Sequence, residues 1–170
     1  MLKLPITLSE IAPRISAGAF ILNSGLGKRG VGAEAAAGIH GFAVGTYPFL
    51  AKVPPEQFVK GLAAAEIGLG AALLTPFVPT FAAGAALTAF SGGLLGLYLK
   101  TPGMRKPGSL APTEQGLAVA KDSWLVGIGI GLMTRGLIER RPRVTVKKAA
   151  KQAKRAAKDA RREARAAARS

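Results

Sequence analysis

The chain has 170 residues, of which 49% are apolar, and it carries a formal net charge of +15. It has no cysteine, which excludes disulfides, thiol catalysis and cysteine-ligated iron–sulfur or zinc centres within the chain. Its single histidine, His40, cannot supply two histidine ligands to a haem or a histidine cluster to a metal, so no metal site is expected.

The charge is concentrated at one end of the chain. Residues 139–170 hold 13 Lys or Arg and 3 acidic residues, whereas residues 1–138 hold 11 basic and 6 acidic residues. The sequence therefore predicts a membrane domain over residues 1–138 and a short basic tail over residues 139–170.

The first apolar run lies between Arg14 and Lys28. Its thirteen residues would cover about 20 Å as a helix, less than the roughly 30 Å of a bilayer core. Extending the helix back to about residue 4 makes it long enough to span, and Arg14 then lies near the opposite interface. We expect a carboxylate to stabilise Arg14, and Glu10, one turn away, is the local candidate. A signal peptide is the alternative, but it requires an apolar stretch that Glu10, Pro13 and Arg14 do not interrupt.

Residues 29–57 form a long connection with few charges. Such a segment predicts a short amphipathic or re-entrant helix that lies on the mouth of the bundle. His40 falls in this connection, where we expect a packing or surface residue rather than a ligand.

Two further apolar runs, 58–77 and 80–99, are separated only by Val78 and Pro79, which predicts a transmembrane hairpin. A Pro/Gly loop follows at residues 100–112, and Thr113 is a candidate N-cap for a last helix over 116–138. A soluble four-helix protein is the alternative, but it should show a polar outer face, and the 80–99 run carries no charge on any face.

The predicted fold is all-α: a polytopic membrane protein with a four-transmembrane-helix bundle and a basic helical tail. The expected spans are about residues 4–26, 58–77, 80–99 and 116–138. Three rows of small residues fit helix contact faces. They are Gly61-Ala65-Gly68-Ala72, Thr88-Gly92-Gly96 and Ser123-Gly127-Gly131.

Four spans would place both termini on one side of the membrane, with 29–57 and 100–115 on the other side. Because basic residues favour the cytoplasmic side, the tail predicts that both termini are cytoplasmic and that the protein is a multi-pass plasma-membrane protein.

Polar residues interrupt all four apolar segments at a similar depth. At about 1.5 Å per residue they lie roughly 7–13 Å below the ends that face the long loops. They are Asn23, Glu66, Ser91, Lys121 and Asp122. Ionisable groups at such depth normally face the bundle interior and pair there.

We therefore expect a polar pocket open to the loop side, with Glu66 and Asp122 as acids and Lys28, Lys121 and Arg14 as their partners. Two close carboxylates would favour proton exchange or binding of a quinone-like head group, so a quinone is the expected cofactor candidate. The structural alternative is that these are buried ion pairs that only fix helix register.

The tail after Pro142 is rich in Ala, Lys and Arg, which are strong helix formers. Basic residues recur along one helical stripe, at Lys147, Lys151, Lys154, Lys158, Arg161, Arg165 and Arg169. We expect this stripe to bind anionic lipid heads, at about 1 kcal/mol per basic residue near the surface. Nucleic-acid binding is a second option and a merely solvated topology determinant is a third.

The chain resembles the DoxX-like family of small bacterial and archaeal membrane proteins over about residues 10–137. The resemblance rests on Arg14-x3-Gly18, Gly25-x2-Lys28, Glu66-x-Gly68-x-Gly70 and Asp122 in the last span. It implies a four-helix membrane bundle associated with redox enzymes, in which the membrane subunit partners a soluble oxidoreductase subunit.

From this resemblance we expect a non-catalytic membrane subunit or anchor of a redox or oxidative-stress complex in a bacterial plasma membrane. Because the chain lacks cysteine, any redox group must be held elsewhere. A quinone- or proton-handling component that uses Glu66 and Asp122 is one alternative. A small transporter is another alternative. Inverted repeats or broken helices would favour it, and the sequence shows no clear inverted repeat.

Overall fold

The computed structural model describes residues 6–140 of the chain, and within that range it is all-helical apart from one isolated bridge between Arg105 and Pro112. The helices are α1 (Leu8–Gly27), α2 (Ala33–Thr46), the 3-10 helix η1 (Pro48–Lys52), α3 (Pro55–Leu74), α4 (Thr80–Lys100), α5 (Glu114–Ala120) and α6 (Ser123–Arg140). The chain separates into two units, Met1–Leu137 and Ile138–Ser170, and the packing below is that of the first. The basic stripe predicted from Lys147 to Arg169 lies outside the described residues.

Three helical segments of the described chain are long and apolar enough to cross a membrane: α3, α4 and Glu114–Ile138. The expected span 58–77 is shifted to Pro55–Leu74. Pro55 occupies the first turn of α3, where its missing N–H costs nothing, and Pro76 forces the preceding Thr75 into an extended conformation that ends the helix. A short turn then leads directly into α4, as the hairpin prediction required.

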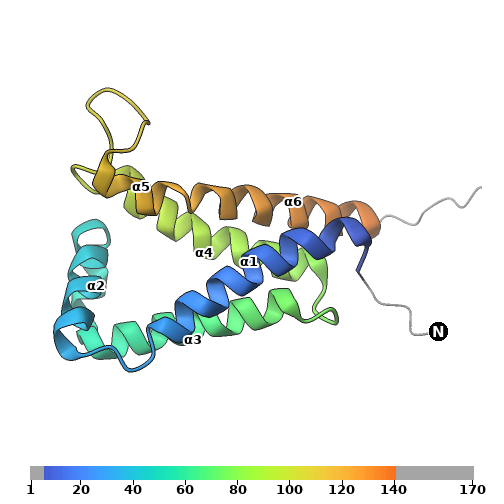
Figure 1. Cartoon of the computed structure of the whole chain (residues 1–170), viewed down its shortest axis with the longest axis horizontal. Helices are drawn as coiled ribbons and strands as arrows, with labels where there is room; N and C mark the ends of the chain where they lie inside the picture. The colour runs from blue at the N-terminus through green and yellow to red at the C-terminus, as the bar shows by residue number, and fades with distance from the viewer. Residues whose placement is uncertain (1–5, 141–170) are drawn as a thin grey trace, which may run out of the picture. The chain divides into compact units, whose positions relative to one another are not determined.

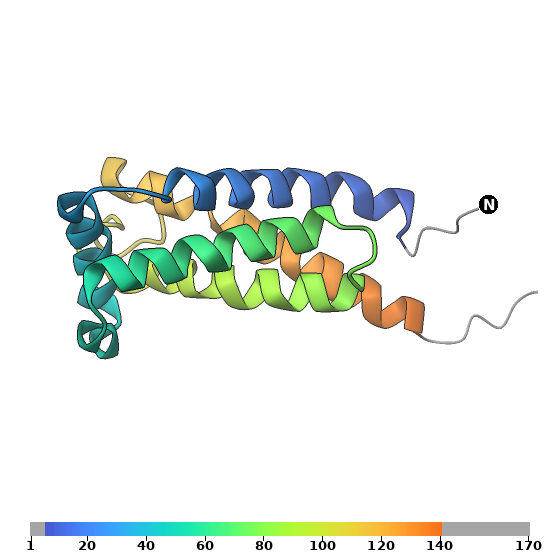
Figure 2. The same ribbon diagram turned by 90° about the horizontal axis from the view of Figure 1, so that it is seen from below.

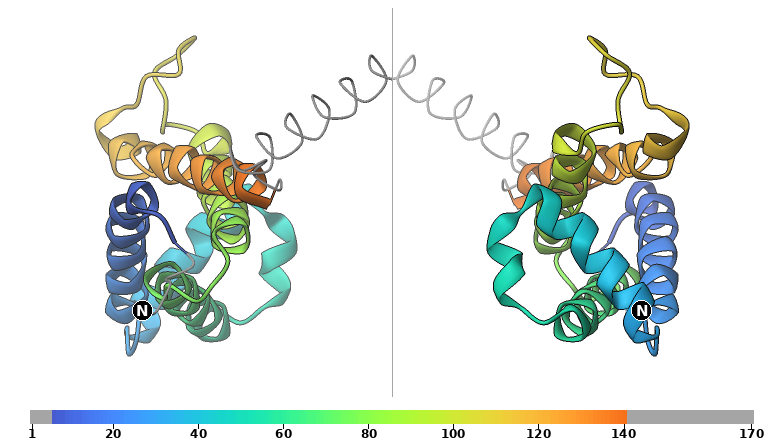
Figure 3. Two further views of the ribbon diagram at one scale, coloured as in Figure 1. Left: turned by 90° about the vertical axis from the view of Figure 1, so that its right-hand side faces the viewer. Right: turned by 90° about the vertical axis from the view of Figure 1, so that its left-hand side faces the viewer.

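The long helices form two closely packed pairs, α1 with α3 and α4 with α6 (Figures 1 and 3). Glycines let the backbones approach: a Cβ added at Gly70 of α3 would lie 2.7 Å from the backbone nitrogen of Leu22 on α1. In the second pair, a Cβ at Gly84 of α4 would lie 2.4 Å from the backbone nitrogen of Met133 on α6. Each pair is thus held at a distance that larger residues could not reproduce.

The small-residue rows expected at helix contacts are largely not the contact faces. A Cβ added at Gly61, Gly68, Gly92, Gly127 or Gly131 would meet nothing within 4 Å in the described structure. Two members of the Thr88-Gly92-Gly96 row are exceptions: the Tyr47 hydroxyl packs directly against Gly96, and a Cβ added at Gly129 of α6 would lie 2.8 Å from the backbone nitrogen of Thr88. Small residues surround these helices on several faces, so spacing alone could not select the face that meets a neighbour.

One apolar core joins the two pairs. Its buried members come from all four long helices: Ala17, Ile21, Leu69, Leu73, Ala83, Leu87, Leu125 and Leu132. The connection between α1 and α3 lies across one end of the bundle, where α2 crosses the ends of the long helices (Figures 1 and 2). The helix expected on the bundle mouth is therefore present, and the space beneath it holds the candidate site.

The expected last helix, 116–138, is broken into α5 and α6 at Lys121 and Asp122. Around the break the backbone N–H groups of Asp122, Trp124 and Leu125 donate to carbonyls three residues earlier rather than four. This local tightening marks the break, and Lys121 and Asp122 at the break line the candidate site.

Candidate functional site

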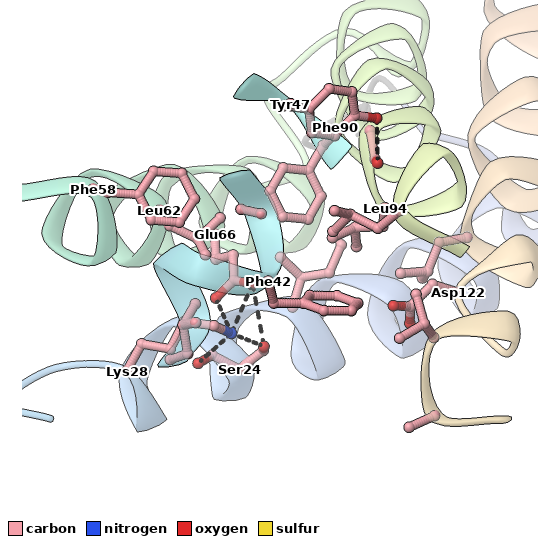
Figure 4. A pocket seen from close by; sticks show the side chains of 18 of the residues that line it. Ser24, Lys28, Phe42, Tyr47, Phe58, Leu62, Glu66, Phe90, Leu94 and Asp122 are labelled. Carbon is pink, nitrogen blue, oxygen red and sulfur yellow. Dashed lines mark hydrogen bonds and ion pairs between the residues drawn. The ribbon is translucent and has the colours of Figure 1, made fainter. Parts of the chain in front are cut away.

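A pocket of about 500 Å³ lies beneath α2, between the α1/α3 pair and the α4/α5 segment (Figure 4). Most of its wall is apolar: Phe20, Ile21, Ile39, Phe42, Ala43, Leu50, Phe58, Leu62, Phe90, Leu94, Leu97, Ala118, Val119 and Leu125. Its volume is within the range of about 300–1,000 Å³ that is common for small-molecule sites. Such a wall suits an apolar ligand body.

An ion pair between α1 and α3 forms the polar part of one wall. Lys28 Nζ donates to both carboxylate oxygens of Glu66, at 2.8 and 2.9 Å, and to the hydroxyl of Ser24 at 2.7 Å. The Glu66 side chain is 5% exposed and that of Lys28 is 22% exposed. Gly25 makes this pair feasible, since a Cβ there would lie 2.8 Å from the Glu66 Cβ.

Asp122 lies on the opposite wall, at the break between α5 and α6 (Figure 4). Its neighbour in the chain, Lys121, also lines the pocket. Two lysines and two carboxylic acids line the pocket, Lys28, Lys121, Glu66 and Asp122. Because their charges balance, the polar lining favours a neutral head group over a charged one.

Helix α2 and the residues after it form the roof. The Tyr47 hydroxyl donates to the carbonyl of Gly93 on α4 at 2.9 Å, and the Thr46 and Thr101 hydroxyls are 2.8 Å apart. His40 Nε2 lies 3.0 Å from the carbonyl of Leu50, and its ring meets that of Phe58 edge-on. His40 therefore has the packing role expected for it.

The structure brings together four of the seven residues expected in the polar layer: Lys28, Glu66, Lys121 and Asp122. Asn23 is exposed on the outer face of α1, although Ser24 beside it faces the pocket. Ser91 is fully buried but donates to the carbonyl of Leu87 within its own helix.

Arg14 lies at the other end of the bundle from the pocket. Its guanidinium donates to the carbonyls of Leu73, Ala72 and Thr75 at the end of α3, at 2.9, 3.1 and 2.7 Å. It also donates to Val78 in the turn and to the Thr80 hydroxyl. Arg14 thus satisfies the terminal carbonyls of α3 and is not part of the pocket.

Glu10 has other contacts than the one expected with Arg14. Its Oε2 accepts from the backbone N–H of Thr7 at 2.9 Å, and its Oε1 lies 4.0 Å from Arg135 on α6. Backbone carbonyls and the Thr80 hydroxyl are therefore the hydrogen-bond acceptors described for Arg14, and Glu10 interacts with its charge only electrostatically.

Several lining residues were not identified from the sequence, among them Ser24, Phe42 and Tyr47. Ser24 lies one helical turn before Lys28 and therefore shares its face, which is a relation the sequence contains. Phe42 and Tyr47 enter the site only because α2 folds over the bundle, which no local pattern specifies.

Within residues 6–140, no three His, Asp or Glu side chains gather as they would around a metal ion. Comparison with protein-family models, curated proteins and solved structures found no match to this chain. The site must therefore be interpreted from its own geometry.

Proposed function

We propose that the protein is a membrane protein that binds a small lipophilic molecule with a neutral polar head, of the quinone class, in the pocket beneath α2. The supporting observation is the pocket itself, with a largely apolar wall and a charge-balanced polar lining at Lys28, Glu66, Lys121 and Asp122. A quinone has an apolar tail for the wall and carbonyl oxygens that accept hydrogen bonds from such a lining.

We propose further that α1 is a fourth span. At about 1.5 Å per residue its 20 residues cover roughly 30 Å, the thickness of a bilayer core. Its charged residues Glu10 and Arg14 are buried against other helices. Its exposed large side chains are apolar: Ile15, Phe20 and Leu26 are 54, 47 and 46% exposed. Apart from the exposed polar residues Ser9, Ser16 and Asn23, the outer surface of α1 is therefore suited to lipid.

The remaining features of the proposal follow from the DoxX-like resemblance and the charge distribution. The protein is a non-catalytic subunit of a redox complex in a bacterial plasma membrane, with both termini in the cytoplasm. A soluble oxidoreductase subunit is its partner, and the basic tail contacts anionic lipid heads.

Ligand-induced stabilisation tests the binding proposal. A short-tailed quinone at about 100 times its dissociation constant should stabilise the protein in nanodiscs by about 2.7 kcal/mol, seen as a raised Tm. Glu66→Gln should abolish this shift, because it removes the partner of Lys28 and unbalances the pocket. Glu56→Gln is the matched control, since Glu56 lies on the same helix with a 63% exposed side chain outside the pocket.

The possible outcomes distinguish a ligand-binding role of the Lys28–Glu66 pair from a purely structural role. Absence of a shift in the wild type would refute quinone binding. A Glu66→Gln protein that unfolds early yet keeps the quinone shift would make the Lys28–Glu66 pair structural only. Loss of one buried partner costs roughly 3–5 kcal/mol, and adding Lys28→Gln should restore part of it by removing the stranded charge.

A transporter is the second candidate, favoured by the break at Lys121 and Asp122. Interrupted membrane helices commonly line the substrate sites of transporters. Flux of a quinone analogue across proteoliposomes that is absent from empty vesicles would favour this candidate over a binding subunit.

A further inference from the structure

The pocket is open on one side, at the seam between α1 and α5. Among the described residues that line it, those classed as exposed are Phe20 on α1 and Ala118 and Lys121 at and just after α5. The other lining residues are buried or half-buried. The exposed part of the lining thus follows one seam rather than the mouth beneath α2.

The contact across the seam is made by side chains. The ammonium of Lys121 lies over the Phe20 ring, 5.7 Å from its centroid. Such a cation–π contact at an exposed site contributes little and both side chains can turn away from it.

The neighbouring walls are closed by stronger contacts. Between α1 and α3, Gly25 packs so closely that an added Cβ would lie 2.9 Å from the Ala63 carbonyl. The roof is tied to α4 by the Tyr47–Gly93 hydrogen bond and the Thr46–Thr101 contact. Opening the roof would break these polar contacts, whereas opening the seam needs two side-chain rotations.

The seam lies at a depth where it would face lipid. Phe20 is two turns of α1 below Lys28, or about 12 Å along the helix. Exposed apolar side chains border the seam on the α5/α6 side, at Leu117 and Trp124. Lys121 has the long side chain that reaches from such a depth to the interface.

We propose that the pocket is loaded sideways from the membrane through this α1–α5 seam, with Phe20 and Lys121 as its gate. The occupant is a lipid-dissolved molecule whose neutral head lies by the Lys28–Glu66 pair and whose apolar tail leaves between Phe20 and Lys121. This inference rests on the proposed function, because it takes the pocket to be a ligand site.

Two reversible locks test the route, since the chain has no native cysteine. The seam lock is Phe20→Cys with Lys121→Cys, joined by a short reducible bis-methanethiosulfonate cross-linker. The matched roof lock is Thr46→Cys with Thr101→Cys, joined in the same way. Each protein in nanodiscs is loaded with a tritiated short-tailed quinone, locked, and chased with an excess of unlabelled quinone.

The seam lock should slow release of the labelled quinone at least tenfold, and reduction of the cross-link should restore the rate. The roof lock should change the rate less than twofold. A roof lock that traps the quinone while the seam lock does not would overturn the lateral route but keep the binding site. Failure of every variant and of the wild type to retain quinone would instead refute the proposed function.

Discussion

At the scale of single residues, Arg14 shows how a buried charge can serve structure alone. Its guanidinium satisfies the last carbonyls of α3 and binds the turn into α4, where a positive charge is also favoured by the helix dipole. Arginine suits this position because it offers five donors in a planar array. The pocket residues Lys28 and Glu66 form a separate polar centre at the other end of the bundle.

We predict that Arg14→Met strongly destabilises the protein, because each buried acceptor left unsatisfied costs about 1–3 kcal/mol. Arg14→Lys should lose less, since it keeps the charge but has fewer donors. Thermal unfolding in detergent measures both, with Arg29→Met, at an exposed arginine just beyond α1, as the control. Equal melting of the Arg14→Met and Arg29→Met proteins would contradict this role.

At the scale of elements, the two helix pairs depend on glycines at their contacts. Glycines of the same helix differ in whether the contact requires them. Gly68 and Gly70 both lie in α3, two residues apart. An added Cβ at Gly68 meets nothing within 4 Å, whereas at Gly70 it meets the backbone of α1. Position around the helix axis, rather than residue type, therefore decides which glycine is required.

Substitution of these two glycines by alanine should have opposite effects. Gly68→Ala should leave stability unchanged or raise it by up to about 1 kcal/mol, through the better helix propensity of alanine. Gly70→Ala should lower the Tm, because α1 must move away from α3, and should weaken quinone binding by separating Lys28 from Glu66. Identical melting temperatures for the two variants would show that α1 and α3 do not pack at this face.

At the scale of the whole molecule, the bundle has two chemically different ends. One end holds α2 and the 101–112 loop, and the other holds the α3–α4 turn (Figure 1). The pocket lies at the first end and the Arg14 contacts lie at the second. If all four long helices cross the membrane, these ends face opposite compartments.

Cysteine labelling should therefore give a two-sided pattern in intact cells. Arg29→Cys and Arg105→Cys should react with an impermeant maleimide from outside, because they flank the pocket end. Ser9→Cys and Phe77→Cys should react only after the cells are opened. Reaction of Ser9→Cys and Arg29→Cys from the same side would mean that α1 lies on the membrane instead of crossing it.

The sequence by itself determined that the chain is helical and the order of the polar residues along each helix, whereas the expected ends of α3 and the unbroken last helix were wrong. Helix ends such as those of α3 follow from the local effects of proline on the backbone. A long uncharged run such as 80–99 indicates a helix that is suited to apolar surroundings. Depth follows from spacing along the helix at a fixed rise per residue, which is why Lys28, Glu66, Lys121 and Asp122 could be grouped in advance.

Only the tertiary structure decided which side of each helix meets a neighbour. Successive residues turn by about 100° around the axis, so Asn23 and Ser24 share a depth but face different surroundings. The same reason explains why Gly70 rather than Gly68 contacts α1, and why Arg14 meets the end of α3. Packing against other helices fixes the rotation of each helix about its axis. When small or apolar residues occupy every face of a helix, the local sequence does not indicate this rotation.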